Sequence, residues 1–185
     1  METDTTFIST VVRIKVVGVG GGGNSVVARL AKDKLPGIEL IGVNSDAKQL
    51  GVLQAEGVET LQIGERLTKG RGSGGVPAIG REAAETDEKR LHMILRDADM
   101  VFITAGMGGG IGTGASPVIA GYLREMGILS IGVVTAPFSF EGKRKMQTAN
   151  EGISYLQGLL DGLIVIHNDN LMKVINDRKT PLAQA

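Results

Sequence analysis

Short apolar runs rich in β-branched residues alternate along this chain with segments whose apolar residues recur every three or four positions. The apolar runs predict strands over 11–17, 39–43, 58–63, 100–105, 129–135 and 163–167. Most of these runs are apolar almost throughout, which is typical of strands covered on both faces. Strands that alternate with helices predict an α/β fold: a Rossmann-like, doubly wound parallel sheet of about six strands with helices on both faces and right-handed crossovers.

The segments between the runs predict amphipathic helices. They are expected over 24–35 with Asn24 as the cap, over 77–98 with Pro77 in the first turn, and from Ser116-Pro117 to Gly127. A further helix carries one apolar stripe, which should pack on the sheet and consists of Met146, Ala149, Ile153, Leu156 and Leu160.

Composition limits the classes of function. A length of 185 residues corresponds to about one domain, and 20 basic residues balance 20 acidic ones, so nucleic acid is not an expected partner. The absence of cysteine and the presence of only 2 histidines exclude a disulfide framework, a thiolate nucleophile and a typical zinc site. The acidic start, 1–10, predicts a disordered tail without an export signal. Residues 101–123 lack charge, but their glycines and Pro117 argue against a membrane span. We expect a cytoplasmic protein.

Glycine is the compositional outlier, with 28 of 185 residues, about twice its usual share of roughly 7%. Three glycine-rich stretches, 18–24, 70–75 and 106–114, account for much of this excess. Two of them directly follow predicted strands, and in doubly wound sheets ligands bind beyond the carboxyl ends of the strands. Backbone without Cβ atoms can turn tightly and present N–H groups to a phosphate at a helix N-terminus. We therefore expect a phosphate site there, against the simpler interpretation of tight turns and flexible connectors.

These residues alone leave two types of phosphate ligand open. Gly18, Gly20 and Gly23 have the G-x-G-x-x-G spacing, and Asp46 follows about 20 residues later, as in nicotinamide-dependent oxidoreductases. A second phosphate-binding loop at 106–114 fits a chain of several phosphates better than a bridging pyrophosphate. The P-loop pattern G-x-x-x-x-G-K-[ST] does not occur, so the chain is not a P-loop NTPase.

The stretch GMGGGIGTG at 106–114 resembles the signature loop of the tubulin/FtsZ family. Four other stretches are similar to successive nucleotide-pocket segments of that family: KVVGVGGGGN, GVNSDAKQL, TAPFSFEGKRK and HNDNLMKVI. The resemblance runs in the right order from about residue 13 to 185. It implies a cell-division GTPase that polymerises head to tail into protofilaments. It also implies a position at midcell, accessory division proteins as partners, and no direct insertion into a membrane.

The resemblance further implies that GTP or GDP, with any accompanying Mg²⁺, contacts residues from all these segments. Glu141 matches the acid that binds the ribose, and Lys145 falls where the family usually has a phosphate-side arginine. No catalytic residue and no protein-bound metal cluster are expected within the chain. The expected contacts are Gly20, Gly21, Gly22, Gly23, Asn24, Ser25, Asn44, Asp46, Gly74, Gly75, Gly106, Gly108, Gly109, Gly110, Ile111, Gly112, Thr113, Pro137, Glu141, Lys145 and Asn168.

Besides Lys145, three positions depart from the family pattern. Ser25 and Val76 stand where the family has asparagine, and Ile111 stands where threonine is usual. A lost hydrogen bond typically costs about 0.5 to 1.5 kcal/mol, so we expect binding that persists through the main chain but is weaker, less specific or locked to one phosphate state. A degenerate structural relative without a nucleotide cycle remains an alternative.

The expected domain organisation is a GTP-binding domain over 11–180, followed at 181–185 by the first turn of an interdomain helix. The family's water-activating acidic loop belongs to the part beyond that helix and acts on the neighbouring subunit. We therefore expect this chain to bind guanine nucleotide but to hydrolyse it hardly at all on its own.

Overall fold

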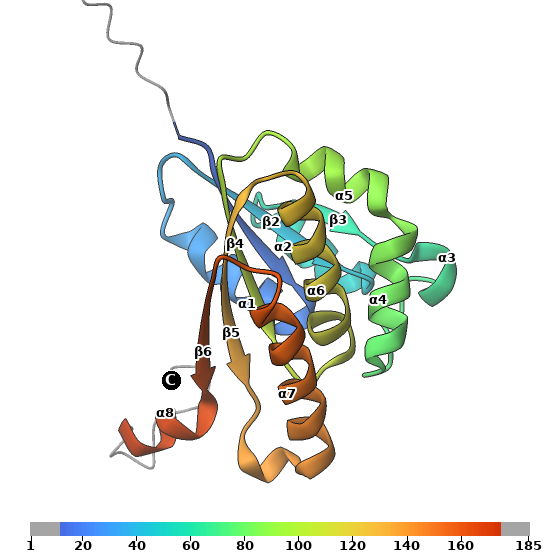
Figure 1. The fold of residues 1–185 in the computed structure, drawn as a ribbon. Helices are drawn as coiled ribbons and strands as arrows, with labels where there is room; N and C mark the ends of the chain where they lie inside the picture. The colour runs from blue at the N-terminus through green and yellow to red at the C-terminus, as the bar shows by residue number, and fades with distance from the viewer. Residues whose placement is uncertain (1–11, 175–185) are drawn as a thin grey trace, which may run out of the picture.

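Parallel strands form one sheet in the computed structural model, which describes residues 12–174 (Figure 1). The sheet has 6 strands in the order β3-β2-β1-β4-β5-β6, so the chain winds outward from β1 in both directions. This confirms the predicted doubly wound α/β fold, and each observed strand overlaps a predicted one. The strands are β1 Ile14–Val19, β2 Ile38–Asn44, β3 Glu59–Gln62, β4 Met100–Gly106, β5 Leu129–Ala136 and β6 Gly162–His167.

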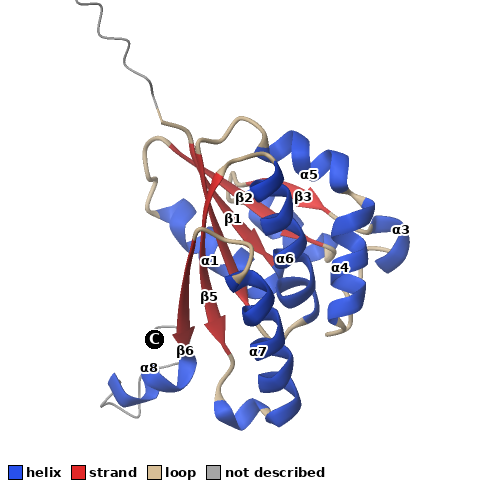
Figure 2. Ribbon diagram, in the orientation of Figure 1, coloured by secondary structure: helices blue, strands red, loops and turns tan. Residues whose placement is uncertain are grey.

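Helices cover both faces of the sheet (Figure 2). On one face, α6 and α7 pack on the strands, and α4 and α5 lie against α6; on the other face lie α1 and α2. The helices are α1 Gly20–Lys32, α2 Ala47–Ala55, α3 Glu65–Thr68, α4 Pro77–Thr86, α5 Glu88–Leu95, α6 Gly110–Glu125, α7 Lys143–Gln157 and α8 Asn168–Val174, with a 3-10 turn at Ser139–Glu141.

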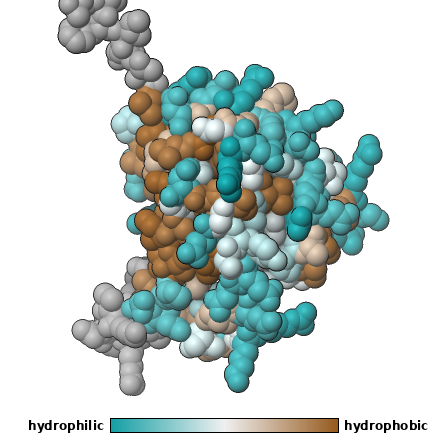
Figure 3. Space-filling model, viewed as in Figure 1, coloured by the Kyte–Doolittle hydropathy of each residue, from teal (hydrophilic) through white to brown (hydrophobic). Residues whose placement is uncertain are grey.

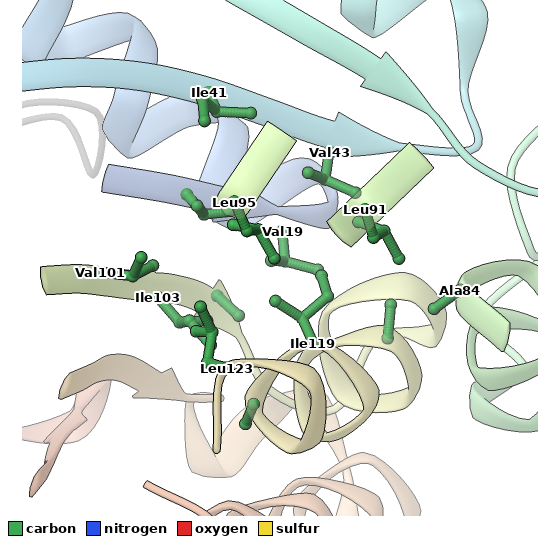
Figure 4. Packing of buried hydrophobic residues seen from close by; sticks show 14 of the residues in the cluster. Val19, Ile41, Val43, Ala84, Leu91, Leu95, Val101, Ile103, Ile119 and Leu123 are labelled. Carbon is green, nitrogen blue, oxygen red and sulfur yellow. The ribbon is translucent and has the colours of Figure 1, made fainter. Parts of the chain in front are cut away.

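Two hydrophobic cores fill the space between the sheet and its helices. Successive residues of a strand point to opposite faces, and accordingly Val16 joins the α1 and α2 core while Val17 and Val19 join the other. The larger core includes Leu91 and Leu95 of α5, which are fully buried (Figure 4). Together the two cores hold β1 and β4 rigidly, and the loops that follow these strands are thereby fixed in space.

The edge strand β6 departs from the prediction that the strands are covered on both faces. Ile164 is 57% exposed and Ile166 is 40% exposed, although both lie in an apolar run. Apolar side chains gather on the side of the molecule where β6 lies (Figure 3). An apolar run in the sequence predicts a strand here, but it cannot show that one face of the strand is exposed to solvent.

The prediction that the first helix begins after a cap at Asn24 was wrong. Helix α1 begins at Gly20 directly after β1, Val19 occupies the cap position, and Asn24 is buried inside the helix. The glycines permit this early start because the first turn lies against β4. A Cβ atom on Gly23 would come within 2.2 Å of the Thr104 carbonyl oxygen.

Two further helix predictions were wrong at their boundaries. The single helix expected over 77–98 is interrupted at Asp87, whose carboxylate accepts from the Gly64 N–H (2.7 Å) and from Arg90 (2.9 Å). The break therefore lies where the Asp87 side chain bonds to the loop before α3. Helix α6 begins at Gly110 and not at Ser116, so Pro117 lies in its interior, where it removes one helical donor.

The predictions for 1–10 and for 181–185 lie outside the described residues. Among the helices that the structure does describe, none combines the length and the apolar character needed to cross a membrane.

Candidate functional site

A cleft of about 400 Å³ opens at the carboxyl ends of β1 and β4, which are the neighbouring strands where the strand order reverses. Open α/β sheets bind their ligands at this position. The structure brings most of the expected residues together in the cleft lining: Gly21, Gly22, Asn44, Asp46, Gly74, Gly75, Gly106, Gly109, Gly110, Ile111, Gly112, Pro137, Glu141, Lys145 and Asn168.

Two helix N-termini form the floor of this cleft. Helix α1 starts directly after β1, and α6 starts a short turn after β4; neither has an acidic residue in its first turn. The two termini touch, because a Cβ atom on Gly20, the first residue of α1, would lie only 2.7 Å from the Gly112 nitrogen of α6. Free N–H groups and the positive ends of two helix dipoles therefore face one small volume, which suits an anion such as a phosphate.

The other expected residues lie beside or beneath the lining. Ser25 is exposed, and its hydroxyl donates to the Gly21 carbonyl oxygen (3.0 Å). Thr113 is buried, and its hydroxyl accepts from the Gly108 N–H (2.8 Å), which fixes the turn before α6. Gly20, Gly23 and Asn24 are buried residues at the start of α1 itself. These residues support the cleft from behind, and their contact with a ligand stays a prediction.

Buried amides connect the loops around the cleft. The Asn44 Oδ1 accepts from the backbone N–H groups of Ser45 (2.8 Å) and Asp46 (3.2 Å), and its Nδ2 donates to the Gln49 Oε1 (2.9 Å). With the Asn24 amide oriented to satisfy its neighbours, its nitrogen donates to the Gly18 carbonyl oxygen (2.8 Å) and its oxygen accepts from Asn44 (3.0 Å). These asparagines hold the start of α1 and the end of β2 in one arrangement.

Asp46 places a carboxylate at one side of the cleft. Its Oδ1 caps α2 by accepting from the N–H groups of Lys48 (2.9 Å) and Gln49 (3.2 Å). The backbone of Asp46 also pairs with Arg71 in an isolated bridge, which ties α2 to the third glycine-rich stretch. Both capping bonds use Oδ1, so Oδ2 is left for a ligand or for a cation that accompanies one.

The other side of the cleft carries an ion pair between Glu141 and Lys145. The Glu141 carboxylate also accepts from the Phe138 N–H (2.8 Å). The hydrogen bond from Lys145 is the main reason that the pKa of Glu141 is lowered, and the Phe138 N–H acts in the same direction against the opposing effect of partial burial. Glu141 is therefore ionised at neutral pH. Within residues 12–174 no group of three histidine or carboxylate side chains is arranged to hold a metal ion.

Replacing Lys145 by alanine should raise the pKa of Glu141 toward its ordinary value, which a carboxyl-detected NMR titration would measure. Because folding lowers this pKa, the pair stabilises the protein above the unfolded-state pKa, and the stabilisation is lost as pH falls through the folded-state pKa. The pair is partly exposed, so its contribution is about 1 kcal/mol at most. The variant Lys143→Ala, which removes a charge from the same helix, is the control. An unchanged Glu141 pKa in Lys145→Ala would contradict the assignment.

Sequence reasoning missed several lining residues. Gly72 and Ser73 lie inside the third glycine-rich stretch and could have been included with Gly74 and Gly75. Met107 and Thr135 lie at strand ends, where the direction of a side chain depends on the register of the sheet. Gln49 comes from α2, a helix that the sequence pattern did not predict.

A parallel sheet with two glycine-rich helix N-termini where the strand order reverses is typical of a nucleotide-binding domain. Comparison with known families identifies the family of this domain: residues 13–176 match the family described as the tubulin/FtsZ family, GTPase domain. The chain belongs to the tubulin/FtsZ family.

Individual relatives agree with this assignment. The chain is 50% identical over 163 residues to the cell division protein FtsZ of Buchnera aphidicola subsp. Baizongia pistaciae, a match that covers 88% of this chain and 42% of that protein. The structure is similar to an M. jannaschii FtsZ dimer, with a TM-score of 0.86 and 42% identity over 92% of this chain and 49% of the other.

A more distant likeness shows the fold alone. CetZ2 from Haloferax volcanii, solved as a GTPγS-bound protofilament, has a TM-score of 0.80 and 22% identity, over 93% of this chain and 53% of that one. The chain spans about half the length of these relatives, or less. None of these matches favours the nicotinamide-dependent alternative.

Proposed function

We propose that this chain binds guanine nucleotide in the cleft between α1 and α6, as the nucleotide-binding half of a tubulin-like cell-division GTPase that polymerises head to tail. The main support for this proposal is that two helix N-termini meet at one cleft, where the strand order reverses. The 50% identity to a cell division protein supports it. By the same relationship, we propose a cytoplasmic protein that acts at midcell with accessory division proteins.

The lining fits a guanosine phosphate. Gly21, Gly22 and the first turn of α6 would bind the phosphates through their N–H groups, which needs no positively charged side chain. The ionised Glu141 would accept from the ribose hydroxyl groups. Asp46, with its free Oδ2, would contact the phosphate-bound Mg²⁺, whose chemistry would be to neutralise phosphate charge.

Hydrolysis by the chain alone should be slow. A general base must lie within hydrogen-bond reach of the attacking water. The two carboxylates of the cleft lining have other roles in this proposal, because Asp46 would contact the phosphate-bound Mg²⁺ and Glu141 pairs with Lys145. We propose that efficient turnover requires groups from a neighbouring subunit of the filament.

The residues that depart from the family pattern differ in whether they line the cleft. Ile111 lines the cleft and is 5% exposed, so its methyl groups replace a polar group at the floor. Val76 is exposed and lies at the N-cap of α4, outside the lining residues. Ser25 is also exposed and outside the lining. Of these three departures, only Ile111 therefore favours the alternative of a degenerate relative, for which assembly independent of nucleotide would be the supporting result.

Guanine nucleotide should raise the melting temperature of the chain, whereas NAD should not. At a ligand concentration of 100 times Kd, binding adds about 2.7 kcal/mol to the free energy of unfolding, which corresponds to about 5 to 10 °C for a domain of this size. Thermal denaturation with GDP, GTPγS or NAD measures the effect. Mass spectrometry of any nucleotide released on denaturation provides an independent check. Stabilisation by NAD alone would contradict the proposal.

A further inference from the structure

A second hollow, of about 650 Å³, lies on the outer side of α6 and shares no lining residue with the cleft described above. Helix α6 lies between α4 and α7 (Figure 1), and all three helices contribute to the lining. The lining residues of α6 extend from Thr113 to Glu125, which is roughly 18 Å, or about three helical turns. We call this elongated hollow the α6 groove.

The floor of the α6 groove is apolar and open. Pro117 and Val118 of α6 line it together with Leu159, which follows α7. A Cβ atom on Gly121, in the middle of the α6 lining, would meet no heavy atom within 4 Å, so the space in front of this residue is free. Tyr155 of α7 also lines the groove and is 69% exposed. A hollowed apolar surface of this kind is typical of a contact with another molecule.

The rim of the α6 groove carries more negative than positive charge. Its charged residues are Arg81, Glu85, Glu125 and Glu151. The Arg81 Nε donates to Glu85 (2.7 Å), whereas Glu125 and Glu151 form no ion pair among residues 12–174. The pKa of the Tyr122 hydroxyl is raised, first by partial burial and then by nearby carboxylates that include Glu85 and Glu125. The chain as a whole has no net charge, so this negative field is local.

A long apolar floor with an acidic rim is complementary to an amphipathic helix that carries lysine or arginine beside its apolar stripe. Such helices insert apolar side chains at intervals of three and four residues into a groove. The longer helices of residues 12–174 already bury their apolar stripes in the two cores, so they are not free to occupy the groove of a second copy. We propose that the α6 groove binds a basic amphipathic helix of another protein. This inference does not rest on the proposed function.

The test measures the binding of two fluorescent synthetic peptides to the 185-residue chain by fluorescence anisotropy. Both peptides have about 15 residues, which is long enough to form a helix, and both have leucine at helical spacing. One peptide carries lysine at the remaining positions, and the other carries glutamate. The lysine peptide should bind at least about tenfold more tightly than the glutamate peptide, because like charges at the rim repel the latter.

Two substitutions should weaken the binding of the lysine peptide. Gly121→Leu fills the groove and excludes an apolar side chain of the peptide, which should weaken binding by about tenfold or more. Glu125→Lys should weaken binding by about three- to tenfold, and added salt should reduce this difference. The matched controls are Gly51→Leu and Glu56→Lys, which make the same changes at exposed positions of α2 or its C-cap, on the other face of the sheet. A Cβ atom on Gly51 also meets no heavy atom within 4 Å.

A loss of affinity in the two groove variants, with both controls unchanged, supports the inference. Circular dichroism melting verifies folding, and Glu125→Lys decides the result if Gly121→Leu does not fold. The inference is overturned if the lysine peptide does not bind at up to about 1 mM, if both peptides bind equally, or if the controls weaken binding as much as the groove variants. It is also overturned if sedimentation velocity shows that the chain self-associates and that Gly121→Leu prevents this, because a second copy then occupies the groove.

Discussion

Replacing Gly112 by alanine should abolish guanine-nucleotide binding. The new Cβ atom would lie 2.4 Å from the Gly106 carbonyl oxygen, so α6 must move away from the end of β4. The N–H groups of α1 and α6 that should bind the phosphates then no longer point into the same volume. The loss of two or more charge-assisted hydrogen bonds weakens binding by about a hundredfold or more. Isothermal titration with GDP measures this effect. We also expect the free energy of unfolding to fall by about 1 to 3 kcal/mol, because the added methyl group overpacks the contact between α6 and β4.

Gly121 provides the matched control on the same helix. A Cβ atom there meets no heavy atom within 4 Å, so Gly121→Ala should stabilise α6 by up to about 1 kcal/mol through helix propensity alone. Its nucleotide affinity should stay unchanged. Retention of normal GDP binding by Gly112→Ala would show that the contact between α6 and β4 does not shape the site.

Replacing Leu95 by alanine should have the largest effect on stability. Leu95 is fully buried in the larger core at the end of α5 (Figure 4), and truncation of such a side chain costs about 2 to 5 kcal/mol. Chemical denaturation of the ligand-free chain measures the change. Met93→Ala on the same helix is the control, because Met93 is 61% exposed and its loss should change stability by at most about 0.5 kcal/mol.

The two substitutions should separate stability from binding. Helix α5 ends just before β4 begins, whereas the cleft opens where β4 ends. Under conditions where Leu95→Ala remains folded, its affinity for GDP should therefore match that of the unmodified chain, since distant sites act independently. A large loss of affinity in folded Leu95→Ala would mean that the cleft depends on the whole core and not on its local geometry.

The sequence predicted the strands well because the strand signal is strong: buried parallel strands are apolar runs, and β4 and β5 match their predicted ranges closely. Helix boundaries were predicted poorly where glycine and proline occur at the site. The usual rules place proline in the first turn of a helix and glycine just past its end, but in α1 and α6 the glycines form the first turn and Pro117 lies inside. Close contact between helices and strands overrides local preference there.

The candidate site was predicted in outline because glycine loops after strands must meet at one edge of a parallel sheet. What could not be predicted is which neighbours face the ligand. Thr113 and Asn24 are polar and lie in the right segments, yet they turn inward to fix backbone groups. Gln49 lies in a helix without a marked sequence pattern and still reaches the cleft, because Asn44 holds its carboxamide. Such orientations depend on tertiary packing.

The pairing of β1 with β4 also determines when the proposed nucleotide site can form during folding. The two segments that form the cleft floor, the start of α1 and the start of α6, lie far apart in the sequence, and the pairing of β1 with β4 brings them side by side. Contacts between distant segments form late and slowly during folding. A partly folded form that lacks this pair should not bind nucleotide at the proposed site, so the recovery of nucleotide affinity during refolding would mark the moment at which the centre of the sheet closes.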